Sequence, residues 1–176
     1  MKLSQIRVHS LAALGPTEIE ALCGVLLDCV EGGASVSFMW PMSCAKAEDF
    51  WAIASQSLAR GERAVIVAED EHGIVGTVQV IWAQPENQPH RADVAKMLVH
   101  RRARRRGAGA LLLQAAERAA AAAGRTVLVL DTASDDAARL YARGGWTRCG
   151  IIPKYALMPN GAFCDTIVFY KVLSGQ

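Results

Sequence analysis

One stretch of the chain, residues 91–113, limits what the rest can fold into. It reads RADVAKMLVHRRARRRGAGALLL, a short apolar run followed by a basic turn with two glycines and a segment rich in alanine and leucine. The apolar run predicts a buried strand and the last segment a helix. A helix start leaves backbone N–H groups unpaired and carries about half a positive charge. Since glycine lets an anion approach closely and arginine adds forked donors, the stretch indicates a phosphate-binding turn.

Three phosphate-binding motifs could describe this turn. A P-loop is excluded, because no Gly-Lys-Ser/Thr sequence follows. The dinucleotide fingerprint G-x-G-x-x-G fits Gly107 and Gly109 but meets Leu112 at its third glycine. The pattern R-x-x-G-x-G is satisfied by Arg104, Gly107 and Gly109, so it describes the turn best.

This pattern, between its strand and its helix, resembles the GNAT superfamily of acetyl-CoA-dependent N-acetyltransferases. The resemblance implies an α/β fold, a mixed and centrally splayed β-sheet flanked by helices, formed by residues 1–176 as a single domain. It also implies that amides of the turn bind the pyrophosphate of coenzyme A and that the strand backbone binds its pantetheine arm. The residues assigned to acetyl-CoA in this way are Met97, Leu98, Val99, Arg104, Arg105, Arg106, Gly107, Ala108, Gly109 and Ala110.

A second segment, residues 137–146, resembles the A-x-x-L-Y-x-x-x-G-[FW] pattern of the same superfamily. There the tyrosine, here Tyr141, points at the sulfur of coenzyme A. A phenol with a pKa near 10 stays protonated at neutral pH and can donate its proton to a leaving thiolate. Core packing with a satisfied hydroxyl is the alternative. Ser134 stands where many relatives carry an asparagine that touches the pantetheine arm, so the resemblance assigns both Ser134 and Tyr141 to cofactor binding.

Two aspartates are candidates for handling the acceptor amine. Asp93 lies four residues before Met97, where many members carry the carboxylate that deprotonates the amine. Residues 32–36, 130–132 and 165–173 further resemble the tabtoxin-resistance acetyltransferases, which act on a small amino-acid-like toxin. That resemblance implies a second carboxylate, Asp131, so that one acid could hold the ammonium and the other take its proton, directly or through water. The alternatives are a solvated Asp93 at a strand start and a turn or cap role for Asp131.

The rest of the chain alternates between strand and helix patterns. Alternating and continuous apolar runs predict strands over residues 5–11, 64–68, 74–83, 126–130, 146–152 and 165–173. Helices are predicted from a capping box at residues 17–20, from Ser43 to about residue 60, after the glycine turn, and over residues 135–143. Phe38 and Trp40 lie in the loop expected to face the acceptor, although core packing is the more ordinary role of such aromatics.

Composition excludes several other classes of protein. With 176 residues, 52% hydrophobic and 20% charged, the chain is long and apolar enough for one full core. A net charge of +2 is small for a nucleic-acid binder, and no aromatics interleave with the arginines, so nucleic acid is not an expected partner. The five cysteines are scattered and form no C-x-x-C, so no metal site is predicted. No run suits a signal core or a membrane span, which leaves the cytoplasm as the default location.

The sequence therefore predicts an acyltransferase of the N-acetyltransferase type (EC 2.3.1), which uses acetyl-CoA and acetylates a primary amine of a small molecule. An amino-acid-like compound, an antibiotic or a toxin would be the acceptor. Transfer should be direct, because no cysteine or serine comes with a recognisable histidine partner. The alternatives are a protein-lysine or N-terminal acetyltransferase, a coenzyme-A-binding protein without activity, and a nucleic-acid-binding module. The resemblance is compatible with a homodimer.

Overall fold

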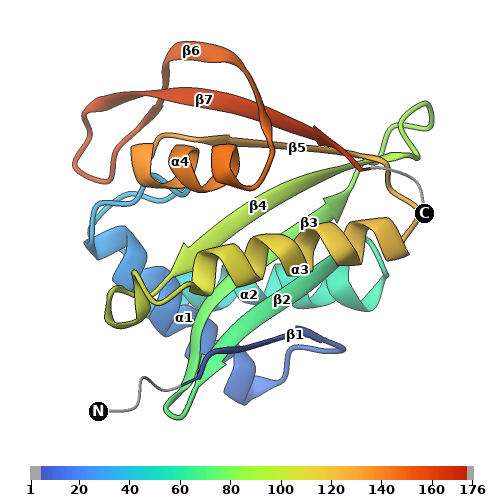
Figure 1. Ribbon diagram of the computed structural model, residues 1–176. Coiled ribbons are helices and arrows are strands. Elements are labelled where there is room, and N and C mark those ends of the chain that lie inside the picture. Colours follow the sequence, from blue (N-terminus) through green and yellow to red (C-terminus); the bar gives the residue numbers. More distant parts are fainter. Residues whose placement is uncertain (1–4, 174–176) are drawn as a thin grey trace.

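The computed structural model describes residues 5–173, which form a seven-stranded sheet in the order β1-β2-β3-β4-β5-β7-β6 (Figure 1). The strands are β1 (Arg7–Leu11), β2 (Arg63–Asp70), β3 (Gly73–Trp82), β4 (Arg91–Val99), β5 (Val127–Thr132), β6 (Thr147–Leu157) and β7 (Phe163–Val172). The helices are α1 (Pro16–Glu31), α2 (Cys44–Ala59), α3 (Ala108–Ala122) and α4 (Asp135–Arg143), with a 3-10 turn η1 at Arg101–Ala103. Only β4 and β5 pair in parallel, so the predicted mixed α/β fold is confirmed.

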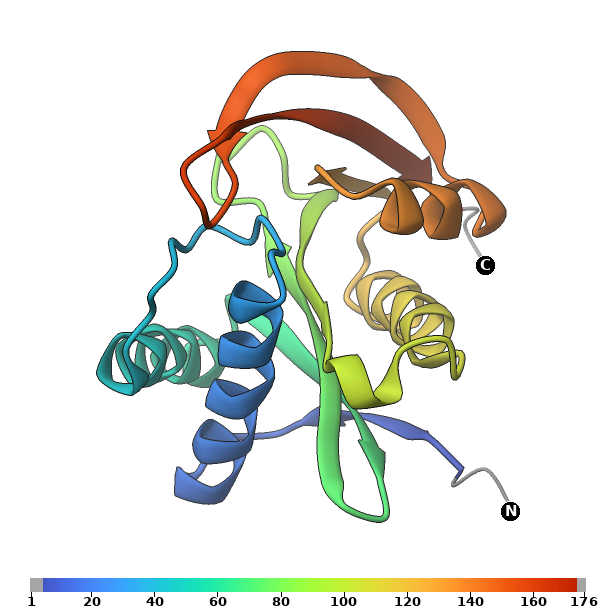
Figure 2. The same ribbon diagram turned by 90° about the vertical axis from the view of Figure 1, so that its left-hand side faces the viewer.

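Helices cover the sheet on both faces (Figure 2). Side chains alternate between the two faces of a strand, and β2 shows the division clearly. Val65 and Val67 point into a core shared with α1 and α2, whereas Ile66 points into a core shared with α3 and with Tyr141 of α4. The two faces are therefore distinct compartments, an α1/α2 face and an α3/α4 face.

The sheet splays at its centre, between β4 and β5. Their parallel pairing ends at the register of Asp93 with Val129, although β4 continues to Val99. A shift in the β3–β4 register between Thr77 and Gln79 marks a bulge in β4, where Lys96 has a φ of 51°. Such a bulge bends a strand and increases its twist. From Val94 onward, the edge of β4 that faces β5 has no strand partner among residues 5–173.

Two helix starts and one strand end show how local patterns translate into structure. The second helix begins as predicted, with Ser43 Oγ accepting from Lys46 N–H at 3.2 Å. The first helix begins earlier than predicted, because Gly15 is the N-cap and its N–H donates to Glu18 at 2.9 Å. β6 also continues past its predicted end at residue 152, through a register shift before Ala156.

Among residues 5–173, no helix has the length and apolar character needed to span a membrane.

Candidate active site

The turn between β4 and α3 has the backbone geometry of an anion site. Gly107 is the N-cap of α3 with a φ of 84°, and Arg105 has a φ of 61°. Left-handed residues in a turn direct N–H groups into a concavity that suits anions. The first bond within α3 runs from Leu111 N–H to the Gly107 carbonyl at 3.1 Å, so the N–H groups at positions 108–110 have no partner among residues 5–173. These are the amides that the sequence assigns to pyrophosphate.

A buried carboxylate, that of Asp70 at the end of β2, holds this turn in place through two arginines. The Asp70 side chain is only 1% exposed and pairs with Arg102 at 2.7 Å and with Arg106 at 3.0 Å. Burial opposes its ionisation, but hydrogen bonds from Arg102, from the backbone N–H of His72 and from Arg106 outweigh that effect and hold the pKa of Asp70 at about 2. Arg106, which the sequence assigns to the cofactor, therefore uses at least part of its guanidinium to stabilise the fold.

We predict that Asp70→Asn lowers the free energy of unfolding by about 1–3 kcal/mol at neutral pH, because it removes the charged acceptor of Arg102 and Arg106, whose side chains are partly exposed to water. The folded pKa lies below the unfolded value of about 3.9. The stabilisation is therefore complete above about pH 4 and is lost as pH falls through about 2. Urea unfolding at neutral pH measures the effect, with the exposed Glu86→Gln as the matched control. Equal stability of Asp70→Asn and wild type would refute this role.

Two other arginines of the turn are also engaged within the chain. Arg101 donates through Nε to Asp28 at 2.8 Å and also bonds Glu31. Arg104 Nε donates to the Val99 carbonyl at 3.2 Å, so the guanidinium closes the corner between β4 and the turn. Arg105 is exposed. Carboxylates within the chain therefore neutralise part of the positive charge of this run, that of Arg101, Arg102 and Arg106.

Tyr141 lies at the α4 side of the splay. It is 4% exposed and its ring packs against Trp146 and Phe169, with centroids 6.0 and 5.7 Å away. Burial raises the pKa of Tyr141 to about 12, and the negative charge of Asp131 adds to the rise. The hydroxyl therefore stays protonated at neutral pH, and it has no hydrogen-bond partner among residues 5–173. The ring packs as a core residue would, but the hydroxyl remains free to donate.

Asp131 and Asp93 lie on the same face of the sheet. Leu128 and Leu130 of β5 point into the α3/α4 core, as Ala92 of β4 does, so strand alternation places both aspartates on the α1/α2 face. Asp131 lies within β5, which makes the turn-or-cap alternative wrong. It accepts a 2.6 Å hydrogen bond from the buried Thr166, while Asp93 pairs with Arg91 at 2.6 Å.

The sequence analysis did not identify Lys96, which lies close enough to Asp131 for that charge to affect its pKa. Lys96 Nζ donates to Ser37 Oγ at 2.9 Å and lies 6.0 and 5.7 Å from the ring centroids of Phe38 and Phe50. Burial lowers the pKa of Lys96; the charge of Asp131 opposes this and the charge of Arg63 adds to it. The sequence did contain a signal for this residue, because Lys96 is a charged residue inside the apolar run that predicts a central strand.

A loop closes over the α1/α2 face beside these residues. It comprises residues 32–43, between α1 and α2, and Figure 2 shows it reaching the turn between β6 and β7. Trp40 N–H donates to the Pro159 carbonyl at 3.1 Å, and Ser35 Oγ donates to the Leu157 carbonyl at 3.1 Å. We call this segment the acceptor loop. Together with the turn between β6 and β7, it borders the face of the sheet on which Asp131 lies.

The remaining predicted cofactor residues take up local structural positions. Ser134 is the N-cap of α4, and its Oγ accepts from Ala137 N–H at 3.3 Å. Leu98 is 1% exposed and belongs to the α1/α2 core, so only its backbone is available to a ligand in the splay. Met97 and Val99 are partly buried on the opposite, α3/α4 face. Their contacts with a cofactor stay predictions.

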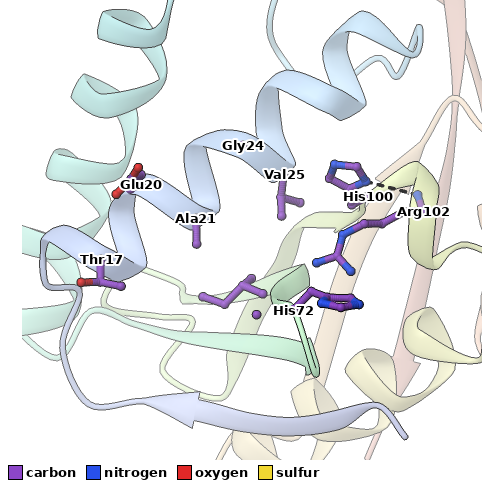
Figure 3. A pocket seen from close by; sticks show the side chains of 10 residues that line it. Thr17, Glu20, Ala21, Gly24, Val25, His72, His100 and Arg102 are labelled. Carbon is purple, nitrogen blue, oxygen red and sulfur yellow. Dashed lines mark hydrogen bonds between the residues drawn. The ribbon is translucent and has the colours of Figure 1, made fainter. Parts of the chain in front are cut away.

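An open groove of about 470 Å³ lies elsewhere, between α1 and the turn that joins β2 and β3 (Figure 3). His72, His100 and Arg102 line one side of it and Thr17 and Glu20 the other. None of the predicted catalytic residues lines it. No group of three or more histidine, cysteine, aspartate or glutamate side chains within residues 5–173 could hold a metal ion.

Comparison with known families decides what this arrangement is. The profile of the acetyltransferase (GNAT) domain matches residues 61–148, which include the splayed strands, the glycine turn and Tyr141. The chain belongs to the GNAT acetyltransferase family. It is accordingly an acetyl-CoA-dependent acyltransferase, and the predicted enzyme class is confirmed.

Solved structures share the GNAT fold over nearly the whole chain. A ribosomal-protein-alanine N-acetyltransferase from Brucella melitensis is 24% identical, with a TM-score of 0.76 over 96% of this chain and 99% of its own. An N-acetyltransferase from Staphylococcus aureus Mu50 is 16% identical, with a TM-score of 0.81 over 97% and 100%. The yncA protein of Salmonella typhimurium, solved with its cofactor acetyl-CoA, is 18% identical, with a TM-score of 0.78 over 97% and 95%. At these identities the likeness establishes the fold.

A matched pair of substitutions at Gly107 tests the phosphate site of this GNAT enzyme. Asparagine and aspartate have the same size and both tolerate a left-handed backbone, so they differ mainly in charge. We predict that Gly107→Asp weakens acetyl-CoA binding roughly 10- to 100-fold relative to Gly107→Asn, because a carboxylate would face the pyrophosphate where a charge-assisted hydrogen bond is worth about 1.5–3 kcal/mol. Calorimetry measures the dissociation constant of acetyl-CoA for each variant. Equal affinities in two folded variants would place the pyrophosphate elsewhere.

Proposed function

We propose that this GNAT enzyme acetylates the primary amine of a small molecule. The acceptor would be an amino-acid-like compound, an antibiotic or a toxin. The observation that carries the proposal is the acceptor loop, which is hydrogen-bonded to Leu157 and Pro159 and so borders the side of the sheet on which Asp131 lies. An approach bordered in this way would suit a small amine better than the side chain or terminus of a folded protein.

The cofactor would enter from the α3/α4 face. The free amides at positions 108–110 and the left-handed turn would hold the pyrophosphate. The unpaired edge of β4 beyond Val94 would pair with the pantetheine arm in place of a strand. This route would place the thioester in the splay beside the Tyr141 hydroxyl. The residues present therefore fit acetyl-CoA from its phosphates to its sulfur.

The amine would approach from the α1/α2 face. Asp131 would hold the ammonium, and Asp93, through water, would accept the proton that leaves before attack. Attack of the amine on the thioester carbonyl forms a C–N bond and an oxyanion, which backbone N–H groups of β4 would stabilise. When the C–S bond breaks, the thiolate would take its proton from Tyr141, and the second proton that the attacking nitrogen loses would return through solvent to the tyrosinate. All of these residue roles are proposals.

A protein acceptor is the second candidate, because the relative from Brucella melitensis is a ribosomal-protein-alanine N-acetyltransferase. A thiol-release assay with acetyl-CoA separates the two candidates. One arm contains amino acids, aminoglycosides and polyamines, and the other contains peptides with free N-termini or lysines. Small amines should give release matched by acetylated product in mass spectra. Turnover with peptides alone would overturn the proposal, and acetyl-CoA binding without any turnover would indicate a silent fold.

Four further features belong to this proposal. These are the particular likeness to tabtoxin-resistance acetyltransferases, a homodimer, a cytoplasmic location, and the organisation of residues 1–176 as one domain. For a second copy, the exposed apolar side chains of the β6–β7 hairpin, such as Ile151 and Phe163, would be the natural contact.

A further inference from the structure

Lys96 is held in an unusual place for a lysine. It lies in the bulge of β4 with a φ of 51°, a left-handed conformation that non-glycine residues adopt uncommonly. The neighbouring β4 residues on either side belong to an apolar run, and Leu98 two positions later is fully packed. The bulge turns Lys96 toward the acceptor loop, where its ammonium bonds Ser37, a residue that is itself left-handed at φ 77°.

The ammonium of Lys96 is only partly satisfied. It has three donors, of which one goes to the neutral Ser37 hydroxyl. Two aromatic faces, those of Phe38 and Phe50, flank it and favour a cation there. No carboxylate within residues 5–173 lies at ion-pair distance from it. Asp131 is near enough to influence its pKa but does not form a contact pair. A half-buried cation without a counter-ion is costly unless an anion joins it.

We infer that Lys96 determines acceptor specificity by binding a carboxylate of the substrate, so that the acceptor carries an anionic group beside its reactive amine. The inference rests on the proposed function. An amino acid matches both charges, with its ammonium on Asp131 and its carboxylate on Lys96. A purely cationic diamine would instead bring a second positive charge next to Lys96, and it is a poorer acceptor for that reason.

A purely structural role for Lys96 makes a different prediction. If its purpose were to anchor the acceptor loop through Ser37, removing the Ser37 hydroxyl would have the same consequence as removing the ammonium. Ser37→Ala is therefore the matched control, because it breaks the loop contact and leaves the cation. Lys96→Arg is the conservative variant, because it keeps the charge and adds a forked donor for carboxylate.

The experiment compares acceptors that differ only in the carboxylate. Lysine is paired with cadaverine and ornithine with putrescine, and kcat/KM is measured for wild type, Lys96→Met, Lys96→Arg and Ser37→Ala. Wild type should prefer the amino acid by roughly tenfold or more, the value of one charge-assisted hydrogen bond. Lys96→Met should bring the ratio close to one, mainly through KM for the amino acid, while Lys96→Arg and Ser37→Ala keep most of it. Melting temperature and acetyl-CoA affinity verify that each variant is folded.

The outcomes separate this inference from the function on which it rests. Turnover of small amines with no preference for the carboxylate, or a preference that Lys96→Met leaves intact, overturns the role of Lys96 and spares the proposed function. An equal loss of preference in Ser37→Ala shows that the loop contact, not the charge, is responsible, and also overturns it. Turnover with peptides alone overturns the proposed function itself.

Discussion

Tyr141→Phe should lower kcat on the order of a hundredfold, the usual cost of losing one hydrogen bond made in the transition state. The substitution keeps the ring, which packs against Trp146 and Phe169, and removes only the hydroxyl. That hydroxyl, with a pKa of about 12, is fully protonated at neutral pH and is the acid that we propose for the departing thiolate. Steady-state kinetics with both substrates saturating measures the loss, and KM for acetyl-CoA should change little.

A second tyrosine provides the control for that experiment. Tyr155 lies on β6 and is 56% exposed, so Tyr155→Phe makes the same chemical change away from the splay and should leave kcat at the wild-type value. Viscosity dependence of kcat shows whether chemistry or product release limits turnover. If chemistry limits and Tyr141→Phe retains wild-type kcat, the tyrosine has no part in proton transfer.

Asp131→Asn should raise KM for the amine roughly 10- to 100-fold, because it removes a charge-assisted hydrogen bond to the ammonium, which is worth about 1.5–3 kcal/mol. The new amide can still accept the hydrogen bond from Thr166, so β5 and β7 should stay paired. Asp93→Asn should lower kcat/KM at neutral pH with a smaller effect on amine KM, since Asp93 already pairs with Arg91. Separate titrations of amine and acetyl-CoA distinguish the two effects. A wild-type amine KM in Asp131→Asn would remove that residue from the acceptor site.

The cofactor half of the site could be predicted from sequence because its determinants are local. Arg104, Gly107 and Gly109 stand within one turn, and the strand before and the helix after them have strong periodic signals. The strand pattern also placed Asp131 near the C-terminal end of β5. Position along one segment is enough for such features, since the backbone amides that we propose to bind phosphate belong to the turn itself.

The acceptor half depends on contacts between distant segments, and sequence patterns do not show these. Lys96 faces the acceptor loop only because of a bulge in β4, and bulges leave no clear pattern in a single sequence. From the sequence, the charges of Arg102 and Arg106 are expected to be available to phosphate. In the fold, both side chains form ion pairs with Asp70, which comes from a distant segment. The sequence predicted that this strand ends at residue 152, yet pairing of β6 with β7 resumes beyond Pro153 through an irregular register.

The predicted start of α1 was wrong for a different reason. Gly15 caps that helix without a side-chain oxygen, whereas the capping-box pattern begins at Thr17, which has one. Pro16 was the better signal, because proline is favoured at the first helical position.

A single-turnover experiment tests direct acetyl transfer to a small amine most directly. Enzyme in excess over acetyl-CoA is mixed with the best acceptor from the panel and quenched at successive times, and the masses of protein and amine are recorded. We predict that acetylated amine appears at the rate at which acetyl-CoA disappears, while the protein mass stays constant throughout. An acetylated protein that forms and decays at the rate of turnover, or loss of acetyl-CoA without acetylated amine, would contradict this mechanism.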